Sequence, residues 1–171
     1  MNKDHLNYLA KAILFIIIEL FVMARLDLGF YLSVHIYFYF LVLLPVNVEK
    51  HAILLIAFLV GIIVDQALNT GGIHAAASLV SIYLRPMLVK AYGPREGLGK
   101  PDYLTLFNFG IVNFILYVLS IVLIHQTMFV LLESFSIISF GFMVLKILAG
   151  TISTTILYLA IHLIAVRRSS T

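Results

Sequence analysis

Two apolar runs separated by a short polar tip constrain this chain more than any other feature. The runs cover residues 51–64 and 73–89, and the tip between them reads DQALNTGG over residues 65–72. A segment inside a bilayer must satisfy its own backbone hydrogen bonds, so each run is expected to be helical. The glycines of the tip allow a tight turn. The pattern predicts a helical hairpin embedded in a membrane.

The composition indicates that lipid is the solvent for most of the chain. Hydrophobic residues make up 63% of the sequence, against about 45–50% in ordinary soluble domains. Charged residues make up 11%, and no cysteine is present, which excludes disulfides, thiolate metal sites and thiol nucleophiles. The net charge of +3 is a weak argument for nucleic acid, and we expect no nucleic-acid partner. Glu19 inside the first apolar run argues against a cleaved secretory signal.

Six apolar segments are candidates for membrane spans of roughly 17–25 residues. A polar linker at 90–102 separates the last two, and residues 128–139 are apolar but short and interrupted by Glu133, which favours an interfacial or re-entrant helix. We expect a single all-α integral membrane domain over residues 1–171, a bundle of six transmembrane helices. The predicted spans are residues 8–24, 30–44, 51–64, 73–89, 103–124 and 140–166.

The distribution of basic residues predicts the orientation of this bundle. Basic residues concentrate in the loops that face the cytoplasm of a membrane protein. Six spans with both termini in the cytoplasm place most of the basic residues inside, whereas five spans would force a basic cluster outside. The inner residues are Lys3, Lys11, Lys50, Arg85, Lys90, Arg95, Lys100, Arg167 and Arg168, and the outer ones are Arg25 and Lys146.

Two ionisable residues are predicted to lie within the spans, where charge is costly and faces the bundle interior. Glu19 is near the outer end of the first span, and Lys146 is at a matching depth in the last. We therefore expect a Glu19–Lys146 ion pair between the two helices. A structural clasp is favoured over an ion or proton site, because one isolated pair makes a poor relay.

The hairpin tip carries a second cluster of polar groups. Asp65 and His74 are types that bind divalent ions, but one carboxylate and one histidine are too few for a convincing site, so no metal is expected. Helix capping explains the cluster better: Asp65 ends one helix, Asn69 or Thr70 can cap the next, and Gly72 supplies turn freedom. The cluster comprises Asp65, Gln66, Asn69 and His74.

The hairpin has two small residues within its first apolar run and a basic residue near the cytoplasmic end of its second. Ala57 and Gly61 have the spacing that lets membrane helices approach closely, either within the bundle or against a partner. Arg85 followed by Pro86 is expected at the cytoplasmic end of the fourth span. There Arg85 can reach lipid phosphates or an acidic partner, while Pro86 kinks the last turn.

No catalytic or cofactor pattern is recognisable in the chain. His35, His125 and His162 lie in or near spans, but nothing pairs them for haem, and they are interpreted as satisfied or interfacial histidines. Nucleophile-elbow, zinc-protease and phosphate-loop motifs are absent from the sequence. We expect a protein that is not an enzyme and needs no cofactor.

The hairpin and its flanks resemble the rod shape-determining protein family MreD, most closely the versions found in Bacteroidota. The specific part of the resemblance covers roughly residues 43–97, and the span count and size extend it over nearly the whole chain. The residues that carry it are LLPVN at 43–47, AFLVGIIVD at 57–65, GIHAAA at 72–77, YLRP at 83–86, PREG at 94–97 and ESF at 133–135.

The resemblance implies a scaffold of the cell-elongation complex in the bacterial inner membrane. Such a protein binds MreC, and through it acts with MreB and the enzymes of lateral-wall peptidoglycan synthesis; its other contacts are membrane lipids. The MreD family is also similar in fold to the substrate-binding subunits of energy-coupling-factor vitamin transporters. That class is the alternative function, with a ligand pocket expected near Asp65, Asn69, His74 and Glu133. An intramembrane enzyme acting on lipid is a third and weaker alternative.

Overall fold

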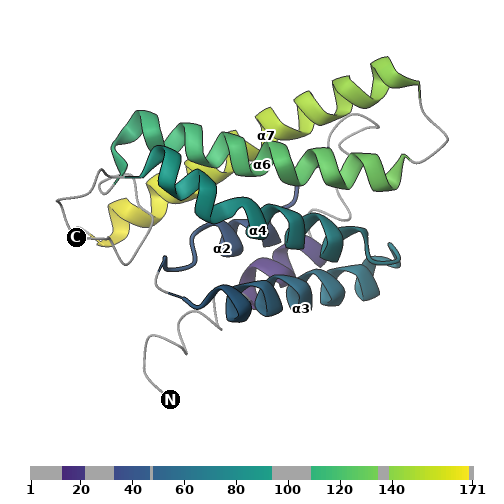
Figure 1. Cartoon of the computed structure of the whole chain (residues 1–171), viewed down its shortest axis with the longest axis horizontal. Helices are drawn as coiled ribbons and strands as arrows, with labels where there is room; N and C mark the ends of the chain where they lie inside the picture. The colour runs from purple at the N-terminus through teal and green to yellow at the C-terminus, as the bar shows by residue number, and fades with distance from the viewer. Residues whose placement is uncertain (1–12, 22–32, 47, 94–108, 135–138, 170–171) are drawn as a thin grey trace.

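The computed structural model describes residues 13–21, 33–46, 48–93, 109–134 and 139–169, and every regular element in these ranges is a helix (Figure 1). Four helices are long, α2 is short, and residues 13–21 form a further helical segment. The labelled helices are α2 (Tyr37–Val42), α3 (Lys50–Leu68), α4 (Ile73–Tyr92), α6 (Ile111–Glu133) and α7 (Phe140–Ser169).

Three of the helices in the described part of the chain are long and apolar enough to cross a membrane. They are Lys50–Leu68, Ile111–Glu133 and Phe140–Ile164. These helices support a membrane protein of the all-α class, as the composition predicts. The count of six predicted spans is not confirmed, and the first predicted span overlaps the described residues only at 13–21.

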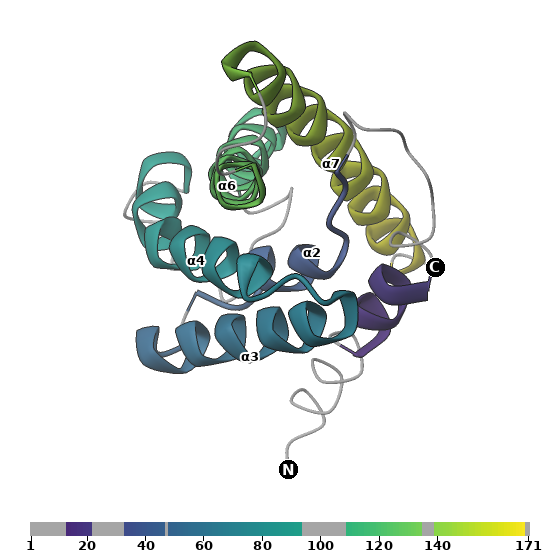
Figure 2. The same ribbon diagram turned by 90° about the vertical axis from the view of Figure 1, so that its right-hand side faces the viewer.

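The predicted second span, residues 30–44, is wrong as a membrane-crossing helix. Residues 33–35 are not helical, and α2 contains only six residues. A helix of this length rises about 9 Å, far short of a bilayer. Figure 2 shows α2 near the middle of the molecule, with α3, α4, α6, α7 and the helical segment 13–21 arranged around it. All six of its residues are buried.

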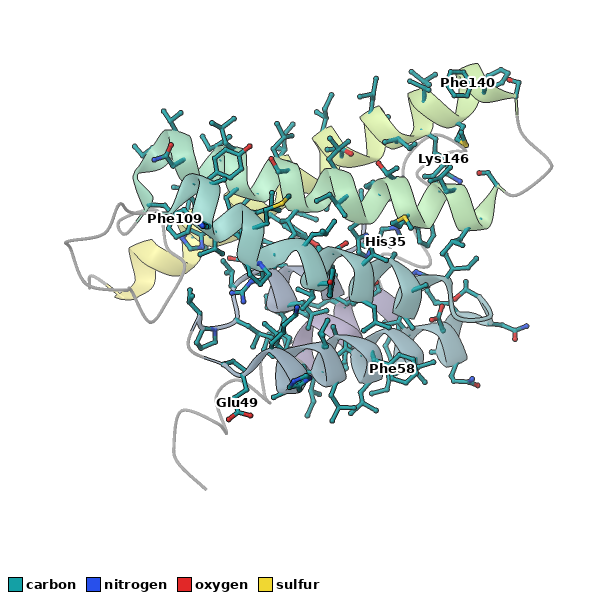
Figure 3. All side chains as sticks on the ribbon, viewed as in Figure 1. His35, Glu49, Phe58, Phe109, Phe140 and Lys146 are labelled. Atoms are coloured by element: carbon teal, nitrogen blue, oxygen red, sulfur yellow. The ribbon has the colours of Figure 1, made fainter. Side chains whose placement is uncertain are left out.

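The physical reason for this difference is that the aromatic run 37–40 packs against protein instead of lipid. Tyr37 and Phe38 are essentially inaccessible, and both belong to the main hydrophobic core. Apolar side chains lie instead on the outside of the helices; Figure 3 shows Phe58 of α3 pointing away from the bundle while His35 lies among the helices. Hydropathy alone does not separate these two environments, because both are apolar.

The other element boundaries also shift. Helix α6 continues to Glu133, so residues 128–133 extend a long helix and do not form a separate interfacial segment; residues 135–138 lie outside the described part. Helix α4 continues through Pro86 to Tyr92, a few residues beyond the predicted end of the span. Helix α6 begins at Ile111, and residues 103–108 of the predicted fifth span lie outside the described part.

The α3–α4 hairpin is the best-predicted part of the fold. Its tip adopts left-handed backbone conformations at Asn69, Gly71 and Gly72, with φ of 58°, 66° and 98°. Such angles suit glycine and, less often, asparagine. Gly61 on α3 packs directly against the backbone of Ala75 on α4. The small residue therefore sets how closely the two helices approach.

Replacing Gly61 by alanine should disrupt this hairpin. A Cβ at position 61 would overlap the Cα of Ala75 and lie 2.7 Å from its backbone nitrogen, so the helices must separate. We expect a clear loss of resistance to chemical unfolding in detergent, measured by circular dichroism. The matched control is Gly141→Ala, where a Cβ meets nothing within 4 Å. Equal stability of the two variants would contradict the close-packing interpretation.

Candidate functional site: a buried polar core around α2

The N-terminal end of α2 is bound by a carboxylate from the helical segment 13–21. Glu19 Oε2 accepts hydrogen bonds from the backbone N–H groups of Ile36, at 2.6 Å, and Tyr37, at 3.2 Å. Glu19 is only 3% exposed. The first N–H groups of a helix have no partner within the helix and carry partial positive charge. Glu19 therefore serves as an N-terminal cap supplied by another part of the chain.

The C-terminal end of α2 is bound in the same way by a cation. The guanidinium of Arg85, from α4, donates to the carbonyl of Leu44 and, through Nε, to the hydroxyl of Tyr117 at 3.1 Å. Tyr117, from α6, in turn donates to the carbonyl of Val42 at 2.9 Å. A short helix with an anion at its N-terminus and a cation at its C-terminus is stabilised at both ends.

The non-helical residues before α2 are held by two further side chains. Gln126 Nε2 on α6 donates to the carbonyl of Ser33 at 2.5 Å, and the hydroxyl of Tyr158 on α7 donates to the carbonyl of His35 at 2.5 Å. Non-helical backbone at membrane depth is tolerated only where protein satisfies its polar groups. Side chains from the segment 13–21, α4, α6 and α7 make hydrogen bonds to the backbone of residues 33–44.

Asp65 binds the N-terminal end of α4, as Glu19 binds the N-terminal end of α2. Its Oδ1 accepts from the backbone N–H of His74 at 3.0 Å and from the Thr70 hydroxyl at 2.5 Å. Its Oδ2 accepts from the backbone N–H of Ala75 at 2.9 Å. The prediction that capping explains the tip cluster is confirmed, but the cap is Asp65 itself, while Asn69 takes the left-handed position that ends α3.

The imidazole of His74 is oriented by the same carboxylate. Its Nδ1 lies 3.0 Å from Asp65 Oδ1 and 3.0 Å from Thr70 Oγ1, and the residue is 2% exposed. The contact with a carboxylate makes Nδ1 the protonated nitrogen. Nε2 is thereby left with its lone pair available.

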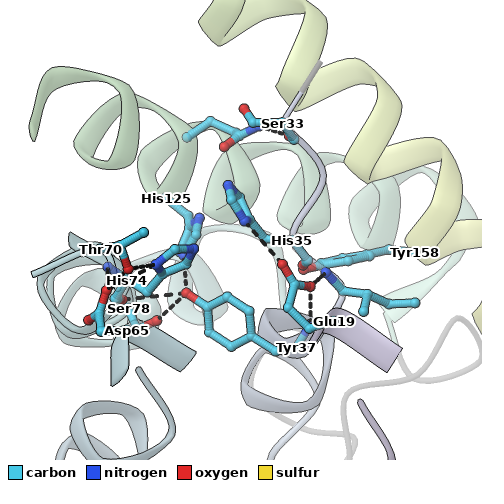
Figure 4. A network of polar contacts seen from close by, with 12 residues as sticks. Glu19, Ser33, His35, Tyr37, Asp65, Thr70, His74, Ser78, His125 and Tyr158 are labelled. Atoms are coloured by element: carbon cyan, nitrogen blue, oxygen red, sulfur yellow. Dashed lines mark hydrogen bonds and ion pairs between the residues drawn. The ribbon is translucent and has the colours of Figure 1, made fainter. Parts of the chain in front are cut away.

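A fully buried tyrosine links α2 to the facing helices. The Tyr37 hydroxyl lies 3.0 Å from Ser78 Oγ and 3.0 Å from His125 Nε2, and it donates to the carbonyl of His74 at 3.4 Å. Figure 4 shows this network between Glu19 and the hairpin tip. His125 is therefore a satisfied histidine, as the sequence predicts, and so is His162, whose Nδ1 lies 3.3 Å from the Tyr39 hydroxyl.

The predicted Glu19–Lys146 pair is corrected by these contacts. Glu19 binds the start of α2, and Lys146 Nζ lies 2.6 Å from Glu133 Oε2, joining the C-terminal end of α6 to the start of α7. Figure 3 shows Lys146 between these two helices. Two residues at matching depth can face different neighbours, because depth does not specify the angular position around the bundle.

The lipid-anchor interpretation of Arg85 is also wrong. Arg85 is 5% exposed, and its donors are used by Leu44 and Tyr117 inside the protein. A buried, hydrogen-bonded guanidinium does not reach phosphate headgroups. Pro86, the next residue, is exposed on the surface of α4.

His35 differs from the other polar residues of this core. Its side chain is 7% exposed, and neither ring nitrogen makes a hydrogen bond within the described residues. Nδ1 lies 3.5 Å from Glu19 Oε1. Glu19, His35 and His74 each offer a ligand atom, and these three atoms lie within 4.8 Å of one another. The sequence places none of these three residues near another, so spacing alone does not reveal the cluster.

The outer face of the α3–α4 hairpin carries an apolar groove with no polar lining. Lys50 Nζ lies 4.4 Å from the ring centroid of Tyr83, a cation–π contact beside the groove. The groove is lined by Leu54, Leu79, Val80, Tyr83 and Leu84.

Comparison of the chain with protein-family models, with curated proteins and with solved structures returned no match.

Proposed function

We propose that this protein is a non-enzymatic scaffold of the bacterial cell-elongation complex, similar in role to the MreD family. It lies in the bacterial inner membrane. It binds an MreC-like membrane protein, and through that partner supports lateral-wall peptidoglycan synthesis and cell shape together with MreB.

The observation that carries this proposal concerns residues 43–97, where the resemblance to MreD is concentrated. The described part of this stretch forms one hairpin whose inner polar residues are used structurally: Asp65 caps α4, and Arg85 binds the end of α2. The residues that line the apolar groove on the outer face of the hairpin take no part in these hydrogen bonds. Membrane helices associate by close packing of complementary surfaces. We assign the groove to a transmembrane helix of the MreC-like partner.

The alternative function, a vitamin-transporter subunit, requires open polar groups near the hairpin tip. Asp65 and His74 are both 2% exposed and bound to each other, and Glu133 is paired with Lys146. Groups already engaged in this way are poorly placed to bind a vitamin. These contacts favour the scaffold over the transporter subunit.

Filling the groove should weaken partner binding. Val80 is half-buried in the groove lining, and the indole of Val80→Trp would occupy space that a partner helix needs. We expect recovery of the MreC-like protein to fall at least about tenfold, which corresponds to 1.4 kcal/mol of binding free energy. The measurement is affinity purification of the tagged protein from native membranes in mild detergent, with quantitative mass spectrometry.

The matched control is Ile156→Trp, which adds the same side chain at a 63% exposed position of α7. This variant should retain the partner. Undiminished recovery with Val80→Trp would remove the groove from the interface. Recovery of transporter ATPase subunits with a bound vitamin, in place of the MreC-like protein, would overturn the scaffold function itself.

A further inference from the structure

We propose that Glu19, His35 and His74 form a binding site for a divalent transition-metal ion of the zinc class. The inference does not depend on the proposed scaffold function. Two imidazoles and one carboxylate are a ligand set that zinc proteins use, with a fourth position left for water or another ligand. The three residues come from the helical segment 13–21, the non-helical residues before α2 and the first turn of α4.

Each of the three residues has one ligand atom that the rest of the structure does not use. Glu19 Oε2 binds the N–H groups at the start of α2, which leaves Oε1 directed toward His35. His74 Nδ1 is taken by Asp65 and Thr70, which leaves Nε2. Neither nitrogen of His35 makes a hydrogen bond within the described part of the chain.

The unused imidazole of His35 is the observation that points to a ligand. A buried polar group without a hydrogen bond is destabilising, and among the described residues Nδ1 has only the 3.5 Å approach to Glu19 Oε1 while Nε2 has no hydrogen-bond partner. Figure 4 shows its ring lying between Glu19 and the pair of His74 and His125. A metal ion bound to a ring nitrogen would satisfy this residue.

Asp65 supplies a second independent observation. Histidines that bind metals commonly donate their other ring N–H to a carboxylate, which fixes the tautomer and orients the ring. The Asp65–His74 contact at 3.0 Å has this arrangement. The one carboxylate and one histidine of the hairpin tip are too few for a metal site by themselves. Asp65 orients His74 as a ligand, and Glu19 and His35 supply the other two ligands.

The distances are compatible with this assignment. Ligand atoms around a tetrahedral zinc ion with bonds of 2.0–2.1 Å are about 3.3 Å apart. The Glu19 Oε1 to His35 Nδ1 distance of 3.5 Å is already near this value, and the three ligand atoms lie within 4.8 Å. Bringing atoms that are up to 4.8 Å apart to this spacing requires rotation of the side chains. His74 is in the first turn of α4, directly after the hairpin tip.

Charge balance also favours a cation at this position. Two buried carboxylates, Glu19 and Asp65, lie on either side of the histidines. The buried basic residues of the described chain have other contacts, Arg85 with Leu44 and Tyr117, and Lys146 with Glu133. Uncompensated charge in a low-dielectric interior is costly. A divalent ion would neutralise both carboxylates.

The test is metal binding by the purified full-length chain, prepared in detergent with an affinity tag that contains no histidine. After chelation, the protein is titrated with Zn²⁺ by calorimetry and with Co²⁺ by visible absorption. We expect one ion per chain, tetrahedral Co²⁺ absorption bands, and a Zn²⁺-dependent rise in the thermal midpoint.

The variant His35→Phe separates a metal ligand from a structural residue. Because His35 makes no hydrogen bond, an aromatic ring of similar size should leave the metal-free protein at least as stable, whereas Zn²⁺ affinity should fall at least about 100-fold, beyond the loss typical of changes behind a ligand. Glu19→Gln keeps an acceptor for α2 and should weaken Zn²⁺ at least about tenfold. His51→Phe, at an exposed position, is the control and should bind normally.

The proposed site would be overturned if the parent chain bound no stoichiometric Zn²⁺. It would also be overturned if His35→Phe and Glu19→Gln both bound Zn²⁺ as well as the parent chain. His35 would then be an ion-pair partner of Glu19. The titration requires no partner protein, so its result is separate from that of the co-purification. Val80→Trp should bind Zn²⁺ as the parent chain does, because residue 80 lines the outer groove.

Discussion

Replacing Arg85 by methionine is expected to lower the free energy of unfolding by about 2–3 kcal/mol. Methionine preserves much of the side-chain volume but leaves the carbonyl of Leu44 without a donor and removes the Nε contact with Tyr117. Each buried polar group left unpaired costs about 1–3 kcal/mol. Tyr117 still donates to Val42, which limits the loss. The measurement is unfolding in detergent micelles followed by far-ultraviolet circular dichroism.

Two further variants identify the cause of that loss. Lys90→Met removes a basic residue at an exposed position of the same helix and should change stability little. Arg85→Lys restores the charge without the forked geometry that reaches both partners, so it should recover only part of the stability. Equal stability of Arg85→Met and the parent chain would contradict the capping role of Arg85.

Glu19→Leu is expected to have the larger effect, about 2–5 kcal/mol. The substitution leaves two buried N–H groups, those of Ile36 and Tyr37, without an acceptor. It also removes the anion from the N-terminus of α2. Because α2 lies at the centre of the bundle, we expect a loss of the near-ultraviolet circular dichroism of its tyrosines together with a lower unfolding midpoint.

Glu19→Gln provides the informative comparison, because its amide oxygen accepts the same hydrogen bonds without charge. It should retain most of the stability that Glu19→Leu loses. Glu49→Leu is the matched surface control, since Glu49 is exposed and points away from the helices in Figure 3. Equal destabilisation by Glu19→Leu and Glu49→Leu would contradict a specific cap.

The local features of the hairpin could be predicted from the sequence because they depend on near neighbours. The turn at Gly71 and Gly72, the close approach at Gly61 and the capping role of the tip all follow from residues within one hairpin. The error there was small: the cap of α4 comes from Asp65, across the turn, and not from Asn69 or Thr70. A cap supplied from nine or ten residues away lies beyond the local capping patterns.

The second predicted span failed for a different reason. A run such as YFYFLV is apolar whether it faces lipid or other helices, so hydropathy predicts a span in either case. What distinguishes the two is the set of polar side chains that bind the backbone of residues 33–44, which include this run. They are Glu19, Arg85, Tyr117, Gln126 and Tyr158. These residues are distributed over most of the chain. Their only signal in the sequence is that tyrosine, glutamine and charged residues interrupt otherwise apolar helices.

Composition and short-range spacing are enough to predict a helical chain, apolar enough for a membrane, that contains a hairpin with a polar tip. Which buried polar groups meet is visible only in the folded structure. Glu19 binds α2 and not Lys146, and His35 and His74 converge on Glu19 although they are 16 and 55 residues away from it in the chain. Such contacts depend on the rotation of each helix about its axis, which packing sets and linear spacing does not record.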